Sequence, residues 1–232
     1  AEKHGFRATF MPKPVEGLTG NGCHAHISVW DAPGSKAKTN VFATTPSTDS
    51  QTSELGLSEK GRHFLGGIMK HASAFAAITN PTVNSYKRIN APRTMSGATW
   101  APNSVTWTGN NRTHMVRVPG PGRFELRLAD GATNPYLLQA VIIAAGLSGV
   151  KSEADPGKRY DIDMYAQGHT VRGAPKLPLN MLDALRAYDK DKGLKEAMGK
   201  EFSEAYLKLK MEEWNSFVSH FSSWEKENTL DI

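Results

Sequence analysis

The sequence of 232 residues predicts an α+β fold, with short strands in its first 130 residues and helices that back them. Two stretches, residues 23–30 and 123–128, alternate apolar and polar side chains as half-buried strands do. Other stretches have helical spacing of apolar residues. The hydrophobic content of 39% and charged content of 22% are typical of a globular chain with its own core, in one large domain or two small ones.

The first part of the chain is predicted to contain two strands and a surface segment. Residues 6–11 and the stretch ending at residue 30 are expected to be strands, joined by a turn at residues 12–22 that is rich in Gly and Pro. Residues 32–53 are rich in Ser, Thr, Pro and Gly, which predicts a surface excursion.

The middle of the chain is predicted to contain a helix, a long loop and two strands. Residues 60–79 have helical periodicity that stops at Asn80 and Pro81. Residues 89–109 have no clear period, and a loop of this length is typically functional or disordered. Short strands are expected at residues 114–118 and 123–129.

The rest of the chain is predicted to be helical. A helix with Pro135 at its first position, capped by Thr133 or Asn134, is expected to run towards Val150. Asn180 is expected to cap a further helix. A stripe near the end predicts core or subunit packing, and it consists of Leu207, Met211, Trp214, Val218 and Phe221.

Composition excludes several classes of protein. The single cysteine, Cys23, excludes a disulfide framework and a Cys-rich zinc module. The longest apolar stretch, residues 136–150, is too short and too polar to span a bilayer, and no signal segment opens the chain. We therefore expect a cytoplasmic protein that does not enter a membrane.

Charge is distributed unevenly. Residues 1–150 carry 15 Lys and Arg against 8 Asp and Glu, and residues 61–123 contain eight Lys or Arg but no acid. Such a tract indicates an anionic partner, unless it is only a solvated basic face. Nucleic acid is one candidate, because Tyr86, Trp100 and Trp107 lie among the basic residues. The isolated arginines favour a shaped site for phosphates and carboxylates instead.

Two histidines are expected on one face of a strand. Because a strand alternates faces, His24, His26, Ser28 and Trp30 share the polar face, opposite Cys23. Such a pair can ligate a metal or hold a phosphate, or can simply be two histidines with structural partners. A Cys-His nucleophile pair is disfavoured, because neighbours in a strand point to opposite faces.

A carboxylate lies between two arginines in the later strand. Arg123, Glu125 and Arg127 share the face opposite the apolar residues. This pattern predicts either a structural ladder of ion pairs or a metal-ligating carboxylate flanked by guanidinium groups that hold anionic substrates. The two histidines favour a site for metal, phosphate and a carboxylate substrate.

The motifs together resemble the glutamine synthetase family, in the C-terminal part of its catalytic domain. The blocks that carry the resemblance extend to about residue 150, and they are Met11-Pro12-Lys13-Pro14, Gly20-Asn21-Gly22-Cys23-His24-Ala25-His26, Asn84-Ser85-Tyr86-Lys87-Arg88, Asn111-Arg112, Arg117-Val118-Pro119, Arg123-Phe124-Glu125-Leu126-Arg127 and Asn134-Pro135-Tyr136. The stretches Ile89-Asn90-Ala91-Pro92-Arg93 and Gly131-Ala132-Thr133 are most similar to the bacterial branch that includes γ-glutamylmethylamide synthetases.

The resemblance implies a curved antiparallel sheet that bears the active site, and an ATP-dependent ligation. Glutamate's γ-carboxylate is phosphorylated, and ammonia or a small alkylamine such as methylamine then displaces phosphate. His24 and Glu125 would ligate Mg²⁺ or Mn²⁺. Nucleotide contacts are implied for His26, Ser28, Arg112, Arg117 and Arg123.

Glutamate contacts are implied for Gly20, Arg88 and Arg127, with Arg88 and Arg112 as the catalytic arginines. By resemblance the protein is a ring-shaped homo-oligomer, a dodecamer, and binds no nucleic acid. Tyr165 lies near a position that is adenylylated in some relatives, but the sequence favours an ordinary surface or packing tyrosine.

The chain departs from the family pattern in two ways. The family's N-terminal domain and the glutamates of its other metal position would precede Ala1, so residues 1–232 are expected to be a catalytic-domain fragment that is inactive alone. The loop at residues 89–109 lacks the glutamate that helps the family deprotonate ammonium, and it offers Met95, Trp100 and Trp107 instead. The alternative function is a non-catalytic, nucleotide-binding relative.

Overall fold

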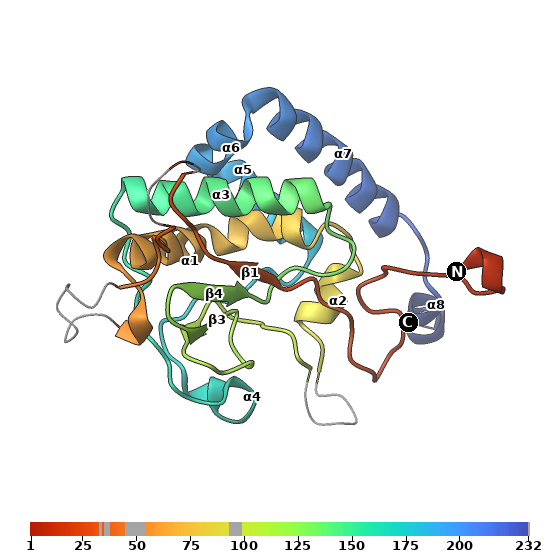
Figure 1. The fold of residues 1–232 in the computed structure, drawn as a ribbon. Coiled ribbons are helices and arrows are strands. Elements are labelled where there is room, and N and C mark those ends of the chain that lie inside the picture. Colours follow the sequence, from red (N-terminus) through yellow and green to blue (C-terminus); the bar gives the residue numbers. More distant parts are fainter. Residues whose placement is uncertain (33, 35–37, 45–53, 93–98, 232) are drawn as a thin grey trace.

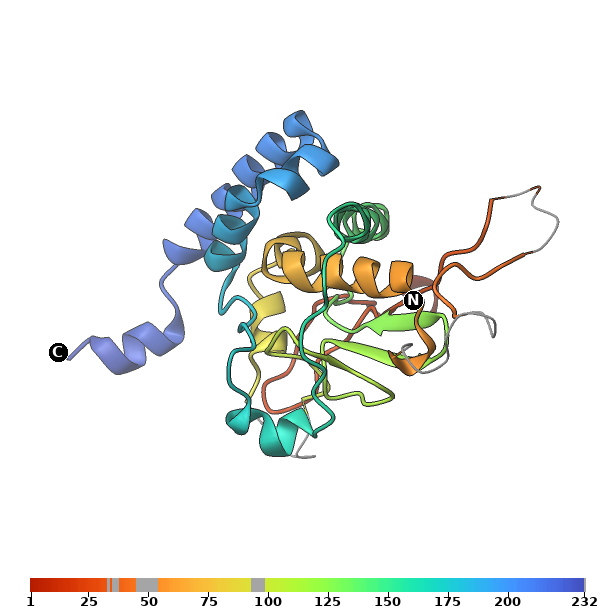
Figure 2. The same cartoon turned by 90° about the vertical axis from the view of Figure 1, so that its left-hand side faces the viewer.

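A computed structural model describes residues 1–32, 34, 38–44, 54–92 and 99–231 of the chain. Figures 1 and 2 show a small sheet covered on one face by helices α1 (Glu59–Thr79) and α3 (Pro135–Lys151), with the C-terminal helices beyond them. The fold is therefore α+β, as the sequence predicts. Parts of the expected surface excursion and of the long loop, including Arg93 and Met95, lie outside the described residues.

The sheet has four strands in the order β1-β4-β3-β2, with bounds β1 Ala25–Ile27, β2 Trp107–Thr108, β3 Val116–Gly120 and β4 Arg123–Leu126. β4 pairs antiparallel with β1 and β3, but β2 pairs parallel with β3, so the expectation of a wholly antiparallel sheet is wrong at this edge. The intervening loop turns the chain back before β3, and the Asn111 side chain holds it by accepting from the backbone N–H of Thr113 (2.9 Å).

The predicted strand at residues 6–11 is not formed. Phe6 and Phe10 are each 71% exposed, and no strand of the described residues pairs with this segment. A strand needs a neighbour to take up its backbone hydrogen bonds and to cover one face. The turn that follows does close, because Asn21 N–H donates to the carbonyl of Pro12 (2.9 Å).

The predicted helices are confirmed, and the structure adds a cap at Ser58 that was not predicted. Ser58 accepts from Gly61 N–H (3.1 Å) at the start of α1, which ends at Thr79. Asn134, rather than Thr133, caps α3. The remaining α-helices are α2 Ser85–Ile89, α4 Met164–Gln167, α5 Met181–Lys190 (capped by Asn180), α6 Lys192–Met198, α7 Lys200–Val218 and α8 Ser223–Thr229. Among the described residues, none of these helices is long and apolar enough to cross a bilayer.

The core lies between the sheet and the two covering helices. Phe42, Phe64 and Phe124 form an aromatic cluster with ring centroids 5.0 to 6.0 Å apart. The backbones of α1 and α3 touch where Gly67 meets Gly149, because a Cβ on Gly67 would lie 2.7 Å from the Gly149 nitrogen. Phe64 of α1 packs on Phe124 of β4, so the apolar face of the sheet lies against α1 and the polar face is the opposite one.

The C-terminal apolar stripe is only partly packed on the core of this chain. Leu207, Met211 and Trp214 pack against the core, as predicted. Val218 is the last residue of α7 and is 56% exposed, and Phe221 lies beyond the helix end and is 76% exposed. These two do not pack in the core, and packing against another subunit stays a prediction for them. Figure 2 shows α8 extending away from the body of the molecule.

Candidate functional site

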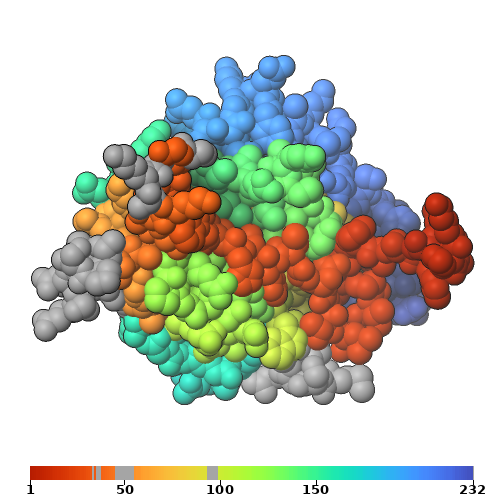
Figure 3. Space-filling view, in the orientation of Figure 1, coloured from red at the N-terminus to blue at the C-terminus, as the bar shows by residue number. Residues whose placement is uncertain are grey.

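Strand register brings the predicted polar residues into one row across the sheet. His26 pairs with Glu125, Glu125 pairs with Arg117, and Arg117 pairs with Thr108. Directly opposed residues on neighbouring strands share a face, so these four side chains lie on the face away from the helices. In Figure 3 the red-orange N-terminal part of the chain lies against the yellow-green segment that carries β3 and β4.

Glu125 is the centre of this cluster and is 2% exposed. Arg117 Nε donates to its Oε2, and Arg127 Nη1 donates to its Oε1 at 2.9 Å. His24 Nδ1 lies 3.1 Å from Oε1, and His26 Nε2 lies 3.9 Å from it. The structure therefore joins the two predicted segments, residues 23–30 and 123–128, into one cluster of ionisable side chains around the buried Glu125.

The charge states of the cluster follow from its surroundings. Burial raises the pKa of Glu125, but the Arg117 hydrogen bond and the charges of Arg127 and Arg117 outweigh this effect, so the pKa lies below its ordinary value. Burial and the Arg127 guanidinium lower the pKa of His24 to about 4, against the attraction of Glu125. At neutral pH, Glu125 is thus an anion and His24 a neutral imidazole, which are the forms that ligate metals.

The donor pair fits part of a site for a divalent cation. Metal–ligand bonds of about 2.1 Å place neighbouring ligands roughly 3 Å apart, and His24 Nδ1 and Glu125 Oε1 are separated by 3.1 Å. Among the described residues, however, no group of three or more His, Cys, Asp or Glu side chains is arranged to hold a metal ion. Any metal bound here would need further ligands from elsewhere.

Arg88 lies next to the cluster, on the backbone of Arg127 and Leu128, and is 2% exposed. Its Nη1 donates to the carbonyl of Leu128 (2.5 Å) and its Nη2 to that of Arg127 (3.2 Å). Burial lowers the pKa of Arg88 to about 10, so the guanidinium stays charged at neutral pH. A Cβ on Gly20 would lie 2.4 Å from the Pro12 carbonyl oxygen and 3.2 Å from Arg88 Cγ, so this glycine lets the N-terminal segment approach Arg88 closely.

Three of the predicted site residues lie outside the cluster around Glu125. Arg112 and Arg123 are exposed, and no ion pair joins either to another residue of the described segments. Ser28 is exposed and accepts from Trp30 Nε1 (3.1 Å). The basic residues of the acid-free tract, residues 61–123, are therefore divided. Arg117 belongs to the cluster and Arg88 lies beside it. Other members have separate partners, such as Arg62 with Asp155 (3.1 Å).

One member of the site was not predicted from the sequence, and Trp107 does not lie where it was expected. The unpredicted member is Asn110, which accepts from Arg117 Nη1 and so fixes the guanidinium from the side opposite Glu125. Trp107 is 1% exposed and faces the helices, so it does not line an amine site. Trp100, in contrast, is 46% exposed, and its carbonyl accepts from Arg127 Nη2 at 3.5 Å.

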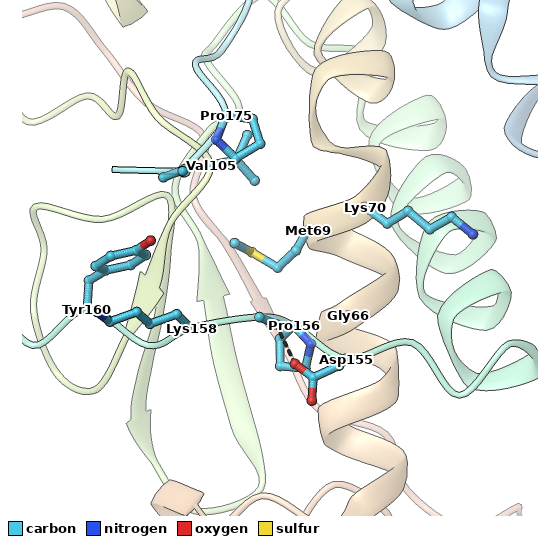
Figure 4. A pocket seen from close by; sticks show the side chains of 12 residues that line it. Gly66, Met69, Lys70, Val105, Asp155, Pro156, Lys158, Tyr160 and Pro175 are labelled. Atoms are coloured by element: carbon cyan, nitrogen blue, oxygen red, sulfur yellow. Dashed lines mark hydrogen bonds between the residues drawn. The ribbon is translucent and has the colours of Figure 1, made fainter. Parts of the chain in front are cut away.

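A separate cavity of about 270 Å³ lies between α1 and residues 155–160 and 173–175. Figure 4 shows Met69 pointing into it and Lys70 pointing away from it. It contains none of the predicted site residues. The sheet face around Glu125 is therefore the better candidate for the functional site.

Known proteins resemble this chain along its whole length. Residues 1–229 match the family model for the catalytic domain of glutamine synthetase. A glutamine synthetase of Rhizobium meliloti (strain 1021) is 73% identical over 232 residues, which are all of this chain and 51% of that protein. A glutamate–methylamine ligase of Methyloversatilis universalis is 41% identical over 235 residues, which cover all of this chain and 51% of that protein.

Solved structures give the same result for the fold. A GmaS/ADP complex superposes with a TM-score of 0.89 at 54% identity, over 100% of this chain and 51% of the other. GmaS without ligand superposes with a TM-score of 0.88 at 51% identity, over 100% and 50% respectively. This chain thus spans about half the length of the curated relatives it matches.

Proposed function

This chain belongs to the glutamine synthetase family through its catalytic domain, and from that premise we propose that it forms part of an enzyme that joins ammonia or a small alkylamine to the γ-carboxylate of glutamate. An oxygen of that carboxylate attacks the γ-phosphorus of ATP and releases ADP. The amine nitrogen then attacks the acyl carbon of γ-glutamyl phosphate and releases phosphate. The observation that carries the proposal is the cluster of His24 with the buried Glu125, Arg117 and Arg127 on the polar face of the sheet.

His24 and Glu125 hold a divalent cation, Mg²⁺ or Mn²⁺, in this proposal. Such an ion supplies charge neutralisation between phosphate and carboxylate groups. Support comes from their 3.1 Å separation and from the low pKa of both side chains. Arg117, which Glu125 and Asn110 fix on both sides, then presents its remaining N–H groups to the phosphates.

The nucleotide and glutamate are assigned to the groups around that centre. His26 and the exposed Ser28 and Arg123 contact the nucleotide, and the exposed Arg112 adds a charge for the transferred phosphoryl group. Phosphoryl transfer depends mainly on positioning and charge neutralisation, which these groups supply.

Glutamate lies between Gly20, Arg88 and Arg127 in this proposal. Gly20 allows the close approach, and the two buried guanidinium groups provide positive charge for the carboxylates. Arg127 Nε is buried and has no hydrogen-bond partner among the described residues, so this cationic side chain is not fully satisfied by the described part of the chain.

The two metal ligands imply that other segments complete the site. Divalent ions take several oxygen ligands, and His24 and Glu125 are only two. We therefore propose that residues 1–232 alone do not turn over, and that the remaining ligands come from the rest of the protein or from a neighbouring subunit of a homo-oligomer. A relative that binds nucleotide without turnover is the alternative.

The test compares the full-length protein with the 232-residue chain. Both are supplied with ATP, glutamate, Mg²⁺ and either ammonia or methylamine, and γ-glutamyl amide is measured. We expect ATP-dependent product only from the full-length protein, with kcat/KM for methylamine at least equal to that for ammonia after correction for free base. Product from the shorter chain would contradict the incomplete site, and no product with either amine would leave the non-catalytic alternative.

A further inference from the structure

Trp100 has an unusual backbone conformation beside the cluster. Its φ is +55°, in the left-handed region that residues other than glycine seldom adopt. The indole is 46% exposed, so this conformation is not maintained by burial of the ring in the core. Residues held in such conformations are concentrated at ligand-binding and active sites.

Two contacts hold Trp100 at the site. Its carbonyl oxygen accepts from Arg127 Nη2 at 3.5 Å, and Arg127 in turn contacts Glu125. The Tyr165 ring meets the indole edge-on, with centroids 6.4 Å apart and an interplanar angle of 86°. Tyr165 belongs to α4, whose first turn is fixed by Asp163 Oδ1 accepting from Tyr165 N–H (2.8 Å).

We propose that Trp100 and Tyr165 form the wall of the amine subsite and favour a small alkylamine over ammonia. The inference rests on the proposed function. The sequence has no Asp or Glu from residue 61 to residue 123 that would attract a bare ammonium ion. An aromatic pair offers instead apolar contact for an alkyl group and a π-face for its cationic form.

The same pair is also suited to stacking against the adenine ring of ATP. The geometry favours the amine, because Trp100 contacts Arg127, which the proposed function assigns to glutamate. The amine must reach glutamate's acyl carbon.

The test uses the full-length protein and measures kcat/KM for methylamine relative to ammonia. Trp100→Leu should lower this ratio about fourfold, the equivalent of burying one methylene group, about 0.8 kcal/mol. Trp100→Phe should retain most of it, and Tyr165→Leu should lower it in the same direction. The remote, 65% exposed Trp224 provides the matched control, Trp224→Leu, which should leave the ratio unchanged.

The Michaelis constants for ATP and glutamate separate the possible roles. We expect Trp100→Leu to leave both within twofold of wild type. An unchanged amine ratio overturns the inference, and an unchanged ratio with a raised KM for ATP assigns the aromatic pair to adenine. If the wild-type protein ligates amines but its ratio does not respond to either substitution, only this inference fails; if it ligates no amine, the proposed function fails with it.

Discussion

Replacing Glu125 by Gln tests whether the central carboxylate serves the reaction or only the fold. The carboxylate accepts from Arg117 through one oxygen and from Arg127 through the other. A glutamine of the same shape has one carbonyl oxygen and one NH₂ group, so it satisfies one arginine and turns a donor towards the other. It also removes the negative charge beside His24.

The size of the effect follows from burial. Glu125 is 2% exposed and Arg127 is 3% exposed, and removing one partner of a buried ion pair costs about 3–5 kcal/mol because the other charge is left uncompensated. If most of this cost falls on the state that binds metal and phosphate, kcat/KM falls by about 100-fold or more, since 1.4 kcal/mol corresponds to a factor of ten.

The assay is amide formation by the full-length enzyme at a series of Mg²⁺ concentrations, together with a melting temperature. We expect Glu125→Gln to lower kcat/KM and to raise the Mg²⁺ concentration needed for half-maximal rate. Arg127→Ala should chiefly raise KM for glutamate. Glu196→Gln, at an exposed position on α6, is the matched control, and it should change neither kcat/KM nor the Mg²⁺ concentration needed for half-maximal rate.

A different pattern would refute this reasoning. If Glu125→Gln and Arg127→Ala lower the melting temperature while each folded enzyme retains wild-type kcat/KM and Mg²⁺ dependence, the segment is a structural ladder of ion pairs. The metal and substrate assignments would then have to be withdrawn.

Two further predictions concern stability. Burial raises the pKa of Asp191, but the hydrogen bond from His71 (Nδ1 to Oδ2, 2.5 Å) helps to bring it below its ordinary value. The ionised carboxylate therefore contributes to the free energy of unfolding above the unfolded pKa of about 3.9, and this contribution is lost as pH falls through the folded pKa. The difference in melting temperature between wild type and Asp191→Asn should shrink below about pH 4, and a difference that is constant from pH 7 to pH 3 would contradict this. Gly67→Ala would place a Cβ 2.1 Å from the Ala145 carbonyl oxygen, so thermal unfolding should reveal a loss of about 3 kcal/mol. Gly193→Ala, whose Cβ would meet only an atom 3.9 Å away, should be neutral or stabilising by up to about 1 kcal/mol, and equal effects of the two substitutions would refute the packing argument.

The sequence by itself determined the features that depend on near neighbours. The helix starts at Asn134 and Asn180 were predictable because a cap bonds to N–H groups two or three residues further on. The alternation of residues 23–30 and 123–128 likewise predicted which side chains share a face of each strand. The family motifs added the expected chemistry of those faces.

Tertiary structure alone decided which faces meet. His26 and Glu125 are far apart in the sequence, and only the register of β1 on β4 places them opposite each other. The same dependence on pairing explains why residues 6–11 form no strand, since no strand of the described residues pairs with them. Trp100 and Trp107 belong to one predicted loop, yet one is exposed beside Arg127 and the other is buried under the sheet. Burial and strand pairing depend on which residues from distant parts of the chain lie nearby, and a local sequence pattern does not specify those residues.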